Sequence, residues 1–219
     1  METEKVLVAM SGGVDSSVAA KLLTDAGFSC IGCTMKLYDN EDAGIPKANT
    51  CCSLDDVEDA RSVAYRLGMP YYVFNLKDKF AECVIDRFVT AYEHGITPNP
   101  CIDCNRYLKF ERLYERARVF GCDAIVTGHY ARIEQENGRW LLKKALDESK
   151  DQSYVLYQLT QEQLAHTRLP LGAMHKSETR RIAEEQGFYN ADKPGSQDIC
   201  FVPDGDYAGF IARYTGHDC

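Results

Sequence analysis

This 219-residue sequence lacks any apolar run close to the roughly 20 residues that a membrane-spanning helix requires. Its first ten residues, METEKVLVAM, lack the charged start, long apolar centre and small-residue cleavage site of a signal peptide. There is no internal repeat and no low-complexity tract. With 45% hydrophobic and 26% charged residues, the composition excludes collagen-like, coiled-coil and disordered classes. We therefore expect a cytoplasmic globular protein of one or two domains.

The sequence also lacks an excess of positive charge, because 33 Asp and Glu outnumber 25 Lys and Arg and the formal net charge is −8. This balance argues against broad non-specific attraction to nucleic acids, although a local basic surface is compatible with it. Cysteine, in contrast, is abundant, with ten residues. In a small secreted chain they would indicate disulfides, but no secretory signal accompanies them here. We expect them to be thiols, thiolates or metal ligands.

Short β-branched runs alternate with helical patterns over the first 130 residues. The patterns predict strands at 5–10, 28–37, 71–75 and 123–127, and helices at 18–27, 54–67, 80–92 and 106–120, with a proline-rich turn, TPNPCIDC, before the last helix. Alternation of this kind is typical of an α/β fold. We expect a parallel sheet with helices on both faces.

The pattern changes after Tyr130. Alternating segments around Asn137-Gly138 predict a β-hairpin, and helices are predicted at 161–165 and 177–186, with loop-like sequence in the remainder. We predict a boundary near residue 146, with an α/β domain over 1–146 and a smaller C-terminal portion over 147–219.

The strongest motif is Ser11-Gly12-Gly13-Val14-Asp15-Ser16-Ser17, between the first predicted strand and helix. Two glycines allow close backbone approach, and a helix N-terminus offers unpaired N–H groups, so the loop is suited to phosphate. Asp15 beside anions is best understood through a bridging Mg²⁺. The alternative, an ordinary strand-to-helix turn, is disfavoured by the complete motif.

This motif is neither GxxxxGK[ST] nor GxGxxG, so kinase, GTPase and dehydrogenase functions lack support. It resembles the pyrophosphate loop of the N-type ATP pyrophosphatases, a resemblance that implies an adenine nucleotide alpha hydrolase-like (Rossmann-like) fold. In that family ATP is split between its α and β phosphates, and a substrate oxygen is adenylated. Further motifs follow in order along the chain: NPCIDCN at 99–105, TGHY at 127–130, KDQSY at 150–154 and SQDICF at 196–201. Together they resemble the tRNA-specific 2-thiouridylases, which place sulfur on C2 of the wobble uridine.

The resemblance implies roles for individual residues. ATP contacts are implied for Ala9, Met10, Ser11, Gly12, Gly13, Val14, Asp15, Ser16, Met35 and Gly128. Cys104 matches the nucleophile, and Cys200 matches the cysteine that carries a persulfide or closes a disulfide with it. Asn99, Pro100 and Cys101 match the surroundings of the target base, while His129, Lys150, Asp151 and Gln152 match tRNA contacts.

The chemistry itself needs two thiols, one to deliver sulfur and one to resolve the resulting S–S bond. Many members of this family have an acidic residue where this chain has Cys101, so Cys101, Cys104 and Cys200 could instead hold a [4Fe–4S] cluster. Persulfide relay and cluster both stay open, and so does a sulfur-handling role for Cys51 and Cys52. For the cysteines inside predicted elements (Cys30, Cys33, Cys83 and Cys122) we expect buried apolar thiols.

Basic residues support a nucleic-acid partner. The segment 105–120 carries five Arg or Lys against two Glu, and Arg139, Lys143 and Lys144 add charge to the predicted hairpin. Such residues position RNA through its phosphates, and the target base must be flipped to expose C2. The resemblance implies tRNAs for Lys, Glu and Gln, and a cysteine desulfurase or relay protein as sulfur donor.

Two other functions stay open: another adenylating enzyme of the same superfamily, and a non-catalytic ATP- or tRNA-binding module that needs a partner. Chains of the resembled family normally continue with a central domain and a C-terminal β-barrel. We therefore expect tRNA affinity to depend on those parts or on a partner.

Overall fold

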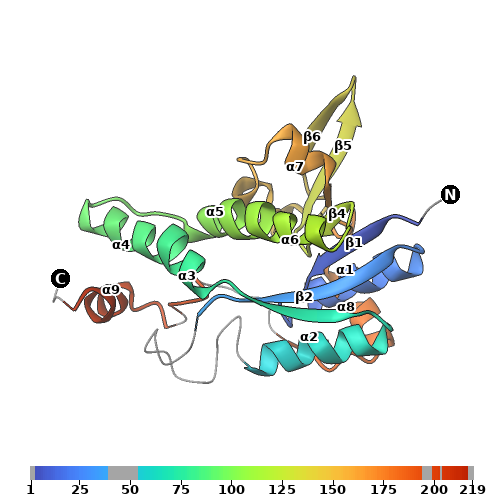
Figure 1. Ribbon diagram of the computed structural model, residues 1–219, viewed down its shortest axis with the longest axis horizontal. Coiled ribbons are helices and arrows are strands. Elements are labelled where there is room, and N and C mark those ends of the chain that lie inside the picture. The colour runs from blue at the N-terminus through green and yellow to red at the C-terminus, as the bar shows by residue number, and fades with distance from the viewer. Residues whose placement is uncertain (1–2, 39–53, 194–198, 203, 217–219) are drawn as a thin grey trace.

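A five-stranded parallel sheet forms the centre of the protein (Figure 1). The structure, a computed structural model, describes residues 3–38, 54–193, 199–202 and 204–216. The strand order is β3-β2-β1-β4-β7, and the strands are β1 (Lys5–Ala9), β2 (Ser29–Lys36), β3 (Tyr71–Asn75), β4 (Ala124–Val126) and β7 (Thr167–Arg168). The sequence predicted the first four. The two-residue β7 carries no alternation that could have predicted it.

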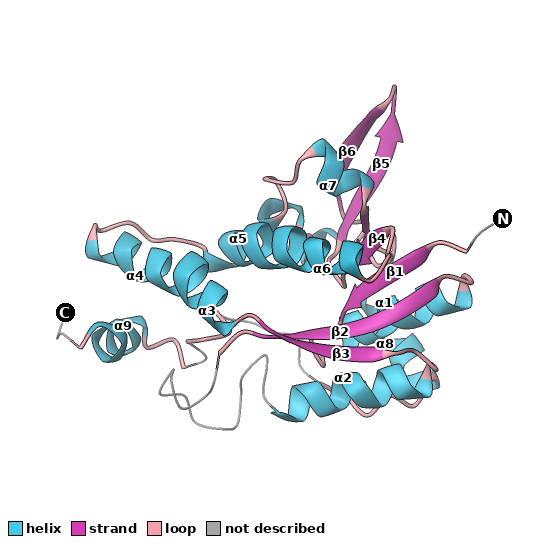
Figure 2. Ribbon diagram, in the orientation of Figure 1, coloured by secondary structure: helices cyan, strands magenta, loops and turns pink. Residues whose placement is uncertain are grey.

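Helices cover both faces of this sheet, as predicted (Figure 2). Successive residues of β1 point to opposite faces, because side chains alternate along a strand. Val6 and Val8 pack with α1 (Val14–Asp25), α2 (Leu54–Arg66) and α8 (Lys176–Glu185). Leu7 packs with the cluster formed by helices of the opposite face. Burial of both strand faces explains the continuous apolar run.

The opposite face is built by two helical stretches. The first comprises α3 (Lys77–Phe80), the π-helix η1 (Ala81–Ile85) and α4 (Asp86–Glu93). The second comprises α5 (Pro100–Asp103), the π-helix η2 (Cys104–Arg112) and α6 (Leu113–Val119). Both begin earlier than predicted.

A turn was expected over the whole of TPNPCIDC, and this was wrong because the chain is already helical at Pro100. The Asn99 side chain accepts a hydrogen bond from the Cys101 N–H at 3.0 Å, which caps the helix. Proline at the first helical position has a suitable φ and no N–H to satisfy. The asparagine-proline pair is therefore a helix start.

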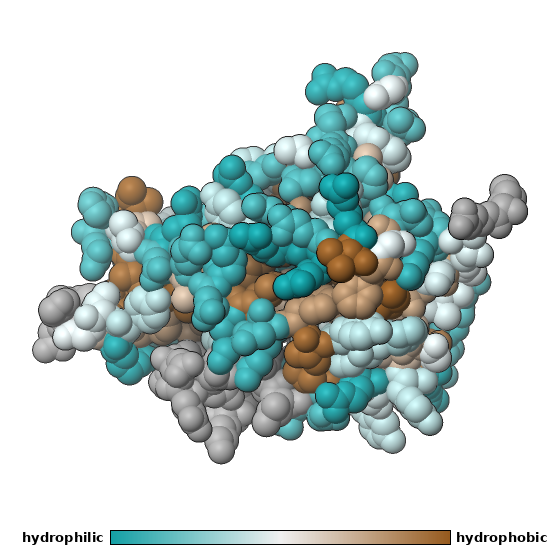
Figure 3. Space-filling model, in the orientation of Figure 1, coloured by the Kyte–Doolittle hydropathy of each residue, from teal (hydrophilic) through white to brown (hydrophobic). Residues whose placement is uncertain are grey.

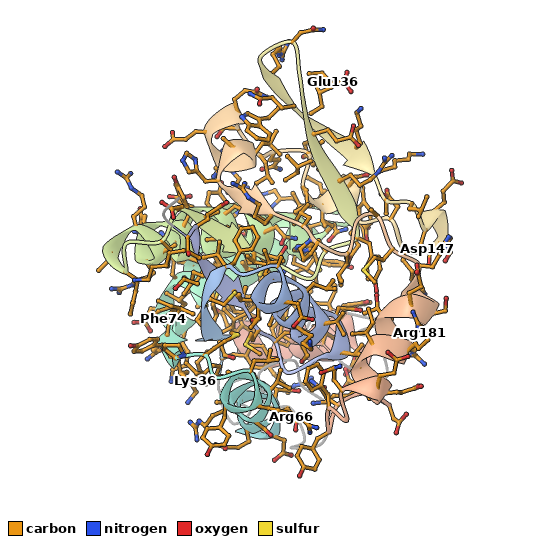
Figure 4. All side chains as sticks on the ribbon, turned by 90° about the vertical axis from the view of Figure 1, so that its right-hand side faces the viewer. Lys36, Arg66, Phe74, Glu136, Asp147 and Arg181 are labelled. Carbon is orange, nitrogen blue, oxygen red and sulfur yellow. The ribbon has the colours of Figure 1, made fainter. Side chains whose placement is uncertain are left out.

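The predicted hairpin is confirmed: β5 (Ala131–Glu136) pairs with β6 (Arg139–Lys144), and both turn residues, Asn137 and Gly138, have positive φ. It projects away from the sheet, and Figure 4 labels Glu136 near its tip. The later helices are η3 (Glu148–Lys150), η4 (Ser153–Val155), α7 (Gln161–Ala165), α8 and α9 (Tyr207–Thr215). Helix α9 was not predicted, because its nine residues follow closely on Pro203 and Gly205.

Residues on both sides of position 146 contribute to one sheet, since β7 pairs with β4. Helix α8 also packs in the same cluster as α1. The predicted boundary near residue 146 stays a prediction.

The surface seen in Figure 3 is mainly hydrophilic, with separate apolar spots. None of the helices in the described part of the chain has the length and apolar character needed to cross a bilayer.

Candidate active site

The strand order reverses at β1, which makes the carboxyl edge of the sheet at this strand a switch point. From β1 the chain proceeds outward to β2 and β3, whereas β4 and β7 lie on the other side of β1. Ligands of open α/β sheets bind where the strand order reverses in this way. The loop that follows β1 and the loop that follows β4 meet at this point. The carboxyl end of β2, with Met35, lies beside them.

Hydrogen bonds of Ser11, Ser16 and Ser17 fix the shape of the loop that follows β1. Gly12 has a φ of +76°, and Gly13 occupies the N-cap position of α1. The Ser16 and Ser17 hydroxyls donate to the Gly13 carbonyl at 3.1 and 3.0 Å, and the Ser11 N–H donates to Ser16 Oγ at 3.1 Å. Helix α1 therefore begins at a hydrogen-bonded turn at the carboxyl edge of the sheet, and the N–H groups of a helix start suit an anion.

Two glycines allow neighbouring backbones to touch this turn. A Cβ at Gly12 would lie 2.4 Å from the Asp56 carbonyl oxygen at the start of α2. A Cβ at Gly128 would lie 2.9 Å from the Ser16 nitrogen. Gly128, which the resemblance assigns to ATP, is thus in direct contact with the loop that follows β1.

Asp15 is held by two groups from other elements. Lys176 Nζ donates to Asp15 Oδ1 at 2.5 Å, and the Tyr130 hydroxyl donates to the same oxygen at 2.9 Å. Burial raises the pKa of Tyr130, so its hydroxyl stays protonated and can donate. Thr179 in turn lies 2.9 Å from the Tyr130 hydroxyl.

Sequence reasoning missed Lys176 and Thr179. Both lie more than 160 residues beyond Asp15 along the chain, and no local spacing connects helix α8 with the glycine loop. Within the described ranges, no three His, Cys, Asp or Glu side chains are grouped to hold a metal ion. The bridging Mg²⁺ expected at Asp15 stays a prediction, and the Lys176 ammonium group binds this carboxylate in the structure.

The two candidate sulfur-handling cysteines pack against one apolar cluster. Cys104 is the first residue of η2, and Cys200 precedes the buried Phe201. Both are half-buried at the edge of the cluster that includes Phe80 and Phe88. Cys104 was expected at the end of the turn TPNPCIDC, and this was wrong because the helix already begins at Pro100.

The iron–sulfur alternative does not fit the described residues. Cys101 is exposed on α5, whereas Cys104 and Cys200 pack at the edge of the apolar cluster. The three do not form a metal-holding group. Cys51 and Cys52, as well as residues 196–198 of the SQDICF motif, lie outside the described residues. Cys219 also lies outside them, and the four cysteines expected inside elements (Cys30, Cys33, Cys83 and Cys122) are buried, as expected.

The residues implied for the target base build the start of the cysteine-bearing helix. Asn99 caps it, Pro100 occupies its first position, and the Asn105 side-chain amide donates to the Cys101 carbonyl at 2.9 Å. Arg87 Nε donates to Asp103 Oδ2 at 3.1 Å and ties this turn to α4. The position of Cys104 is thus fixed from several directions.

The residues implied for tRNA contact have structural hydrogen bonds. The Gln152 N–H donates to the Tyr130 carbonyl at 2.8 Å, and the Tyr130 N–H donates to Gln152 Oε1 at 3.0 Å. Asp151 Oδ1 accepts from the Ala145 N–H at 2.8 Å, and Lys150 is exposed. His129 is buried, with Nδ1 2.7 Å from Thr127 Oγ1. Their contacts with RNA stay predictions.

The buried imidazole of His129 should make the folded protein less stable in acid. Burial, with a smaller effect of nearby Lys109, lowers its pKa well below the ordinary value. The unfolded chain binds this proton below about pH 6.5 and the folded protein does not. The free energy of unfolding should therefore fall, by at most about 1.4 kcal/mol per pH unit, as the pH drops below that value. Urea titrations of wild type and His129→Gln should show this His129 component only in the wild type; an equal slope in both would contradict it.

Some of the basic residues that were expected to position RNA form ion pairs with acidic residues of this chain. Lys143 of the hairpin pairs with both Glu134 and Glu136. Arg106, at the start of η2, donates to Gln158 Oε1 at 3.1 Å and stays exposed. The charge of Lys143 is therefore balanced within the hairpin, whereas Arg106 bonds to a neutral amide oxygen.

The five-stranded parallel sheet, with helices on both faces and a glycine-rich loop at its switch point, is a fold of the adenine nucleotide alpha hydrolase-like class, as expected. Residues 4–204 match the family described as tRNA methyl transferase HUP domain, and the chain belongs to that family. It is 52% identical over 214 residues to the tRNA-specific 2-thiouridylase MnmA of Clostridioides difficile, covering 97% of this chain and 59% of that protein. It is 54% identical to MnmA of Symbiobacterium thermophilum, covering 95% of this chain and 55% of that protein. The resemblance to tRNA-specific 2-thiouridylases is thus confirmed, and the chain spans somewhat more than half the length of these relatives.

Solved structures support the fold. A 4-thiouridine synthetase in complex with RNA and bound ATP has a TM-score of 0.58 and 22% sequence identity, covering 91% of this chain and 45% of that chain. The NMN synthetase of Francisella tularensis has a TM-score of 0.53 and 18% identity, covering 99% of this chain and 78% of that chain. At these identities the similarity concerns the fold alone.

Proposed function

We propose that this chain carries the ATP-dependent step of tRNA uridine 2-thiolation, with the loop from Ala9 to Ser16 as its nucleotide site. The observation that carries the proposal is the preformed Gly12-Gly13 turn at the sheet's switch point, in a chain about half identical to 2-thiouridylases. Met35 and Gly128 complete the proposed nucleotide site. The turn fits phosphate because helix α1 begins there with unpaired N–H groups.

In the proposed reaction, ATP supplies the adenylate that turns the C2 oxygen of the uridine into a leaving group. The terminal sulfur of a persulfide on Cys200 attacks C2, and AMP departs with that oxygen. Cys104, as a thiolate, then attacks the Cys200 sulfur, which releases 2-thiouridine and leaves a Cys104–Cys200 disulfide. An external thiol reductant restores the two thiols. Alternatively, Cys104 releases hydrosulfide first, and the same disulfide results.

The proposed partners follow from this chemistry. The persulfide needs a sulfur donor, a cysteine desulfurase or a relay protein, and the wobble uridine is presented by tRNAs for Lys, Glu and Gln. Asn99, Pro100 and Cys101 surround the base in this proposal. His129, Lys150, Asp151 and Gln152 contact the tRNA. Bound Mg²⁺ would accompany the ATP phosphates, and the reaction would take place in the cytoplasm.

Release of AMP and pyrophosphate from Mg-ATP tests the proposal. Release that depends on unmodified tRNA is the expected result, because adenylation precedes sulfur transfer. Absence of any ATP binding would overturn the proposed nucleotide site. Binding without turnover would assign the chemistry to parts of the longer relatives that this chain does not span.

Asp15 gives a sharper test of the loop. Asp15→Ala removes the acceptor of both Lys176 and Tyr130, so the first turn of α1 loses these hydrogen bonds to α8 and to the residue that precedes β5. We expect the rate of Mg-ATP use to fall more than tenfold, roughly 1.4 kcal/mol or more. Lys176→Met should reproduce most of this loss, whereas Lys21→Met, which removes an ion pair with Asp25 at the C-terminal end of α1, should not. Unchanged pyrophosphate release in Asp15→Ala would show that the carboxylate has no part in nucleotide use.

A further inference from the structure

Cys200 lies in a tight turn, and the backbone of this turn limits where its sulfur can be placed. The Val202 N–H donates to the Ile199 carbonyl at 2.9 Å, which closes a four-residue β-turn with Cys200 and Phe201 as its central residues. The peptide group between two central residues makes no hydrogen bond within such a turn. It can take either of two opposite orientations, as in turns of type I and type II. The direction of the Cys200 carbonyl therefore decides the backbone angles at Cys200.

Tyr38 holds this carbonyl from another part of the chain. The Tyr38 hydroxyl donates to the Cys200 carbonyl at 2.6 Å, and the tyrosine is only 6% exposed. Reversal of the peptide between Cys200 and Phe201 would break this hydrogen bond, which is costly for a hydroxyl on a buried side chain. One of the two orientations of the turn is therefore selected by Tyr38.

Aromatic rings hold the second half of the turn. The ring of Phe201 packs edge-on against Phe80 and Phe88, with 5.7 and 5.2 Å between ring centroids. The Tyr38 ring packs on Phe80 as well, with 5.8 Å between centroids. Cys104 lies at the edge of the same apolar cluster. Ring packing thus fixes Phe201, and the Tyr38 hydroxyl fixes the peptide that precedes it.

Tyr38 also joins the turn to the strand that ends at the proposed nucleotide site. It lies three residues beyond Met35, which is near the carboxyl end of β2. Leu37 and Tyr38 are both buried, so this continuation of β2 is held in the core. In the proposed reaction the Cys200 sulfur must reach a carbon atom whose oxygen carries the adenylate. Such a step requires the cysteine and the nucleotide to keep a fixed mutual arrangement.

We propose that Tyr38 is a positioning residue for sulfur transfer, because its hydroxyl orients the Cys200 turn toward the activated uridine and toward Cys104. The proposal rests on the two-cysteine reaction proposed above. Tyr38 makes and breaks no covalent bond: it holds the Cys200 peptide, and the sulfur of Cys200 reacts. Loss of the hydroxyl frees the peptide to reverse, which lowers the effective concentration of this sulfur at both of its targets.

The thiol–disulfide equilibrium in glutathione buffers tests how well the two cysteines are placed. The Cys104 and Cys200 thiols react with one oxidised glutathione to give the Cys104–Cys200 disulfide and two reduced glutathione molecules. Peptide mass spectrometry after acid trapping measures this pair separately from the other cysteines. Tyr38→Phe removes the hydroxyl and keeps the ring on Phe80. We expect its equilibrium constant to be at least about fivefold lower than that of the wild type.

Turnover gives a second measure of the same variant. With a sulfur donor and unmodified tRNA, we expect kcat for 2-thiouridine formation to fall about tenfold in Tyr38→Phe, because sulfur transfer is slowed. The KM for tRNA and the Kd for ATP should stay within about twofold of the wild type, since the hydroxyl acts on the Cys200 turn after both have bound.

Tyr214→Phe is the matched control. It also removes a tyrosine hydroxyl, which donates to Asp86 Oδ1 at 2.7 Å, and its ring stacks on Phe210 of the same apolar cluster. Thermal unfolding of the reduced proteins measures what each hydroxyl contributes to the fold. We expect comparable losses of thermal stability in the two variants, and the altered equilibrium in Tyr38→Phe alone.

Two other outcomes are distinguishable. An equilibrium constant that is unchanged in Tyr38→Phe, or lowered equally in Tyr214→Phe, overturns the positioning role and leaves the proposed reaction intact. Failure of the wild type to form the Cys104–Cys200 disulfide in any glutathione buffer overturns the two-cysteine reaction itself, and the role of Tyr38 with it.

Discussion

Cys104→Ser is expected to bind ATP as tightly as the wild type and to form no 2-thiouridine. In the proposed reaction Cys104 must attack a sulfur atom of Cys200 as a thiolate. A serine hydroxyl is not ionised near neutral pH and cannot exchange with an S–S bond. We expect a loss of at least about a thousandfold, roughly 4 kcal/mol in the barrier. The packing should be little affected, because the side chain lies at the edge of the apolar cluster.

Thiolation of tRNA by the reconstituted system with a sulfur donor, together with equilibrium binding of ATP, measures the two effects separately. Cys122→Ala is the matched control. Cys122 is buried just before β4, at the edge of the sheet opposite the phosphate loop, and burial raises the pKa of its thiol. This variant should thiolate normally. Formation of 2-thiouridine by Cys104→Ser would remove Cys104 from the mechanism.

Local patterns were sufficient to predict the part of the fold that carries the nucleotide loop. The run Lys5–Met10, the glycine pair and the apolar spacing after Val14 specify strand, turn and helix without reference to the remainder of the chain. Asn137-Gly138 likewise specified its hairpin through the positive φ of both residues. Each of these features depends on neighbours within a few residues.

The features that sequence patterns missed depend on contacts between distant residues. Lys176 and Asn190 look like ordinary helix-start and loop residues, and only the fold brings them to Asp15 and Gly12. Strand β7 is defined by its pairing with the edge of β4, and its two residues are too few to show an alternation of apolar and polar side chains. The helix at Pro100 was missed for a different reason, since a proline-rich stretch indicates a turn unless the capping role of Asn99 is recognised.

Gly12→Ala should disrupt the phosphate loop and destabilise the whole protein, because two independent costs add at this position. A φ of +76° disfavours any residue with a Cβ by about 1–2 kcal/mol. The new Cβ would also lie 2.4 Å from the Asp56 carbonyl oxygen, and Asp56 cannot withdraw easily while Lys193 holds it. We expect the free energy of unfolding to fall by about 2–4 kcal/mol and ATP binding to be lost.

Gly13→Ala is the matched control for the fold, one residue further along the same turn. Gly13 has an extended backbone with a φ of −90°, and the nearest neighbour of an added Cβ is Ser11 Oγ at 3.5 Å, an ordinary contact. Without ATP, its free energy of unfolding should change by less than about 1 kcal/mol, the cost of alanine at an N-cap. ATP affinity can still fall in this variant if phosphate approaches Gly13 closely, so chemical denaturation of the nucleotide-free protein is the deciding measurement. If both alanine variants lowered the free energy of unfolding equally, the close approach of Asp56 to Gly12 would not be what constrains the loop.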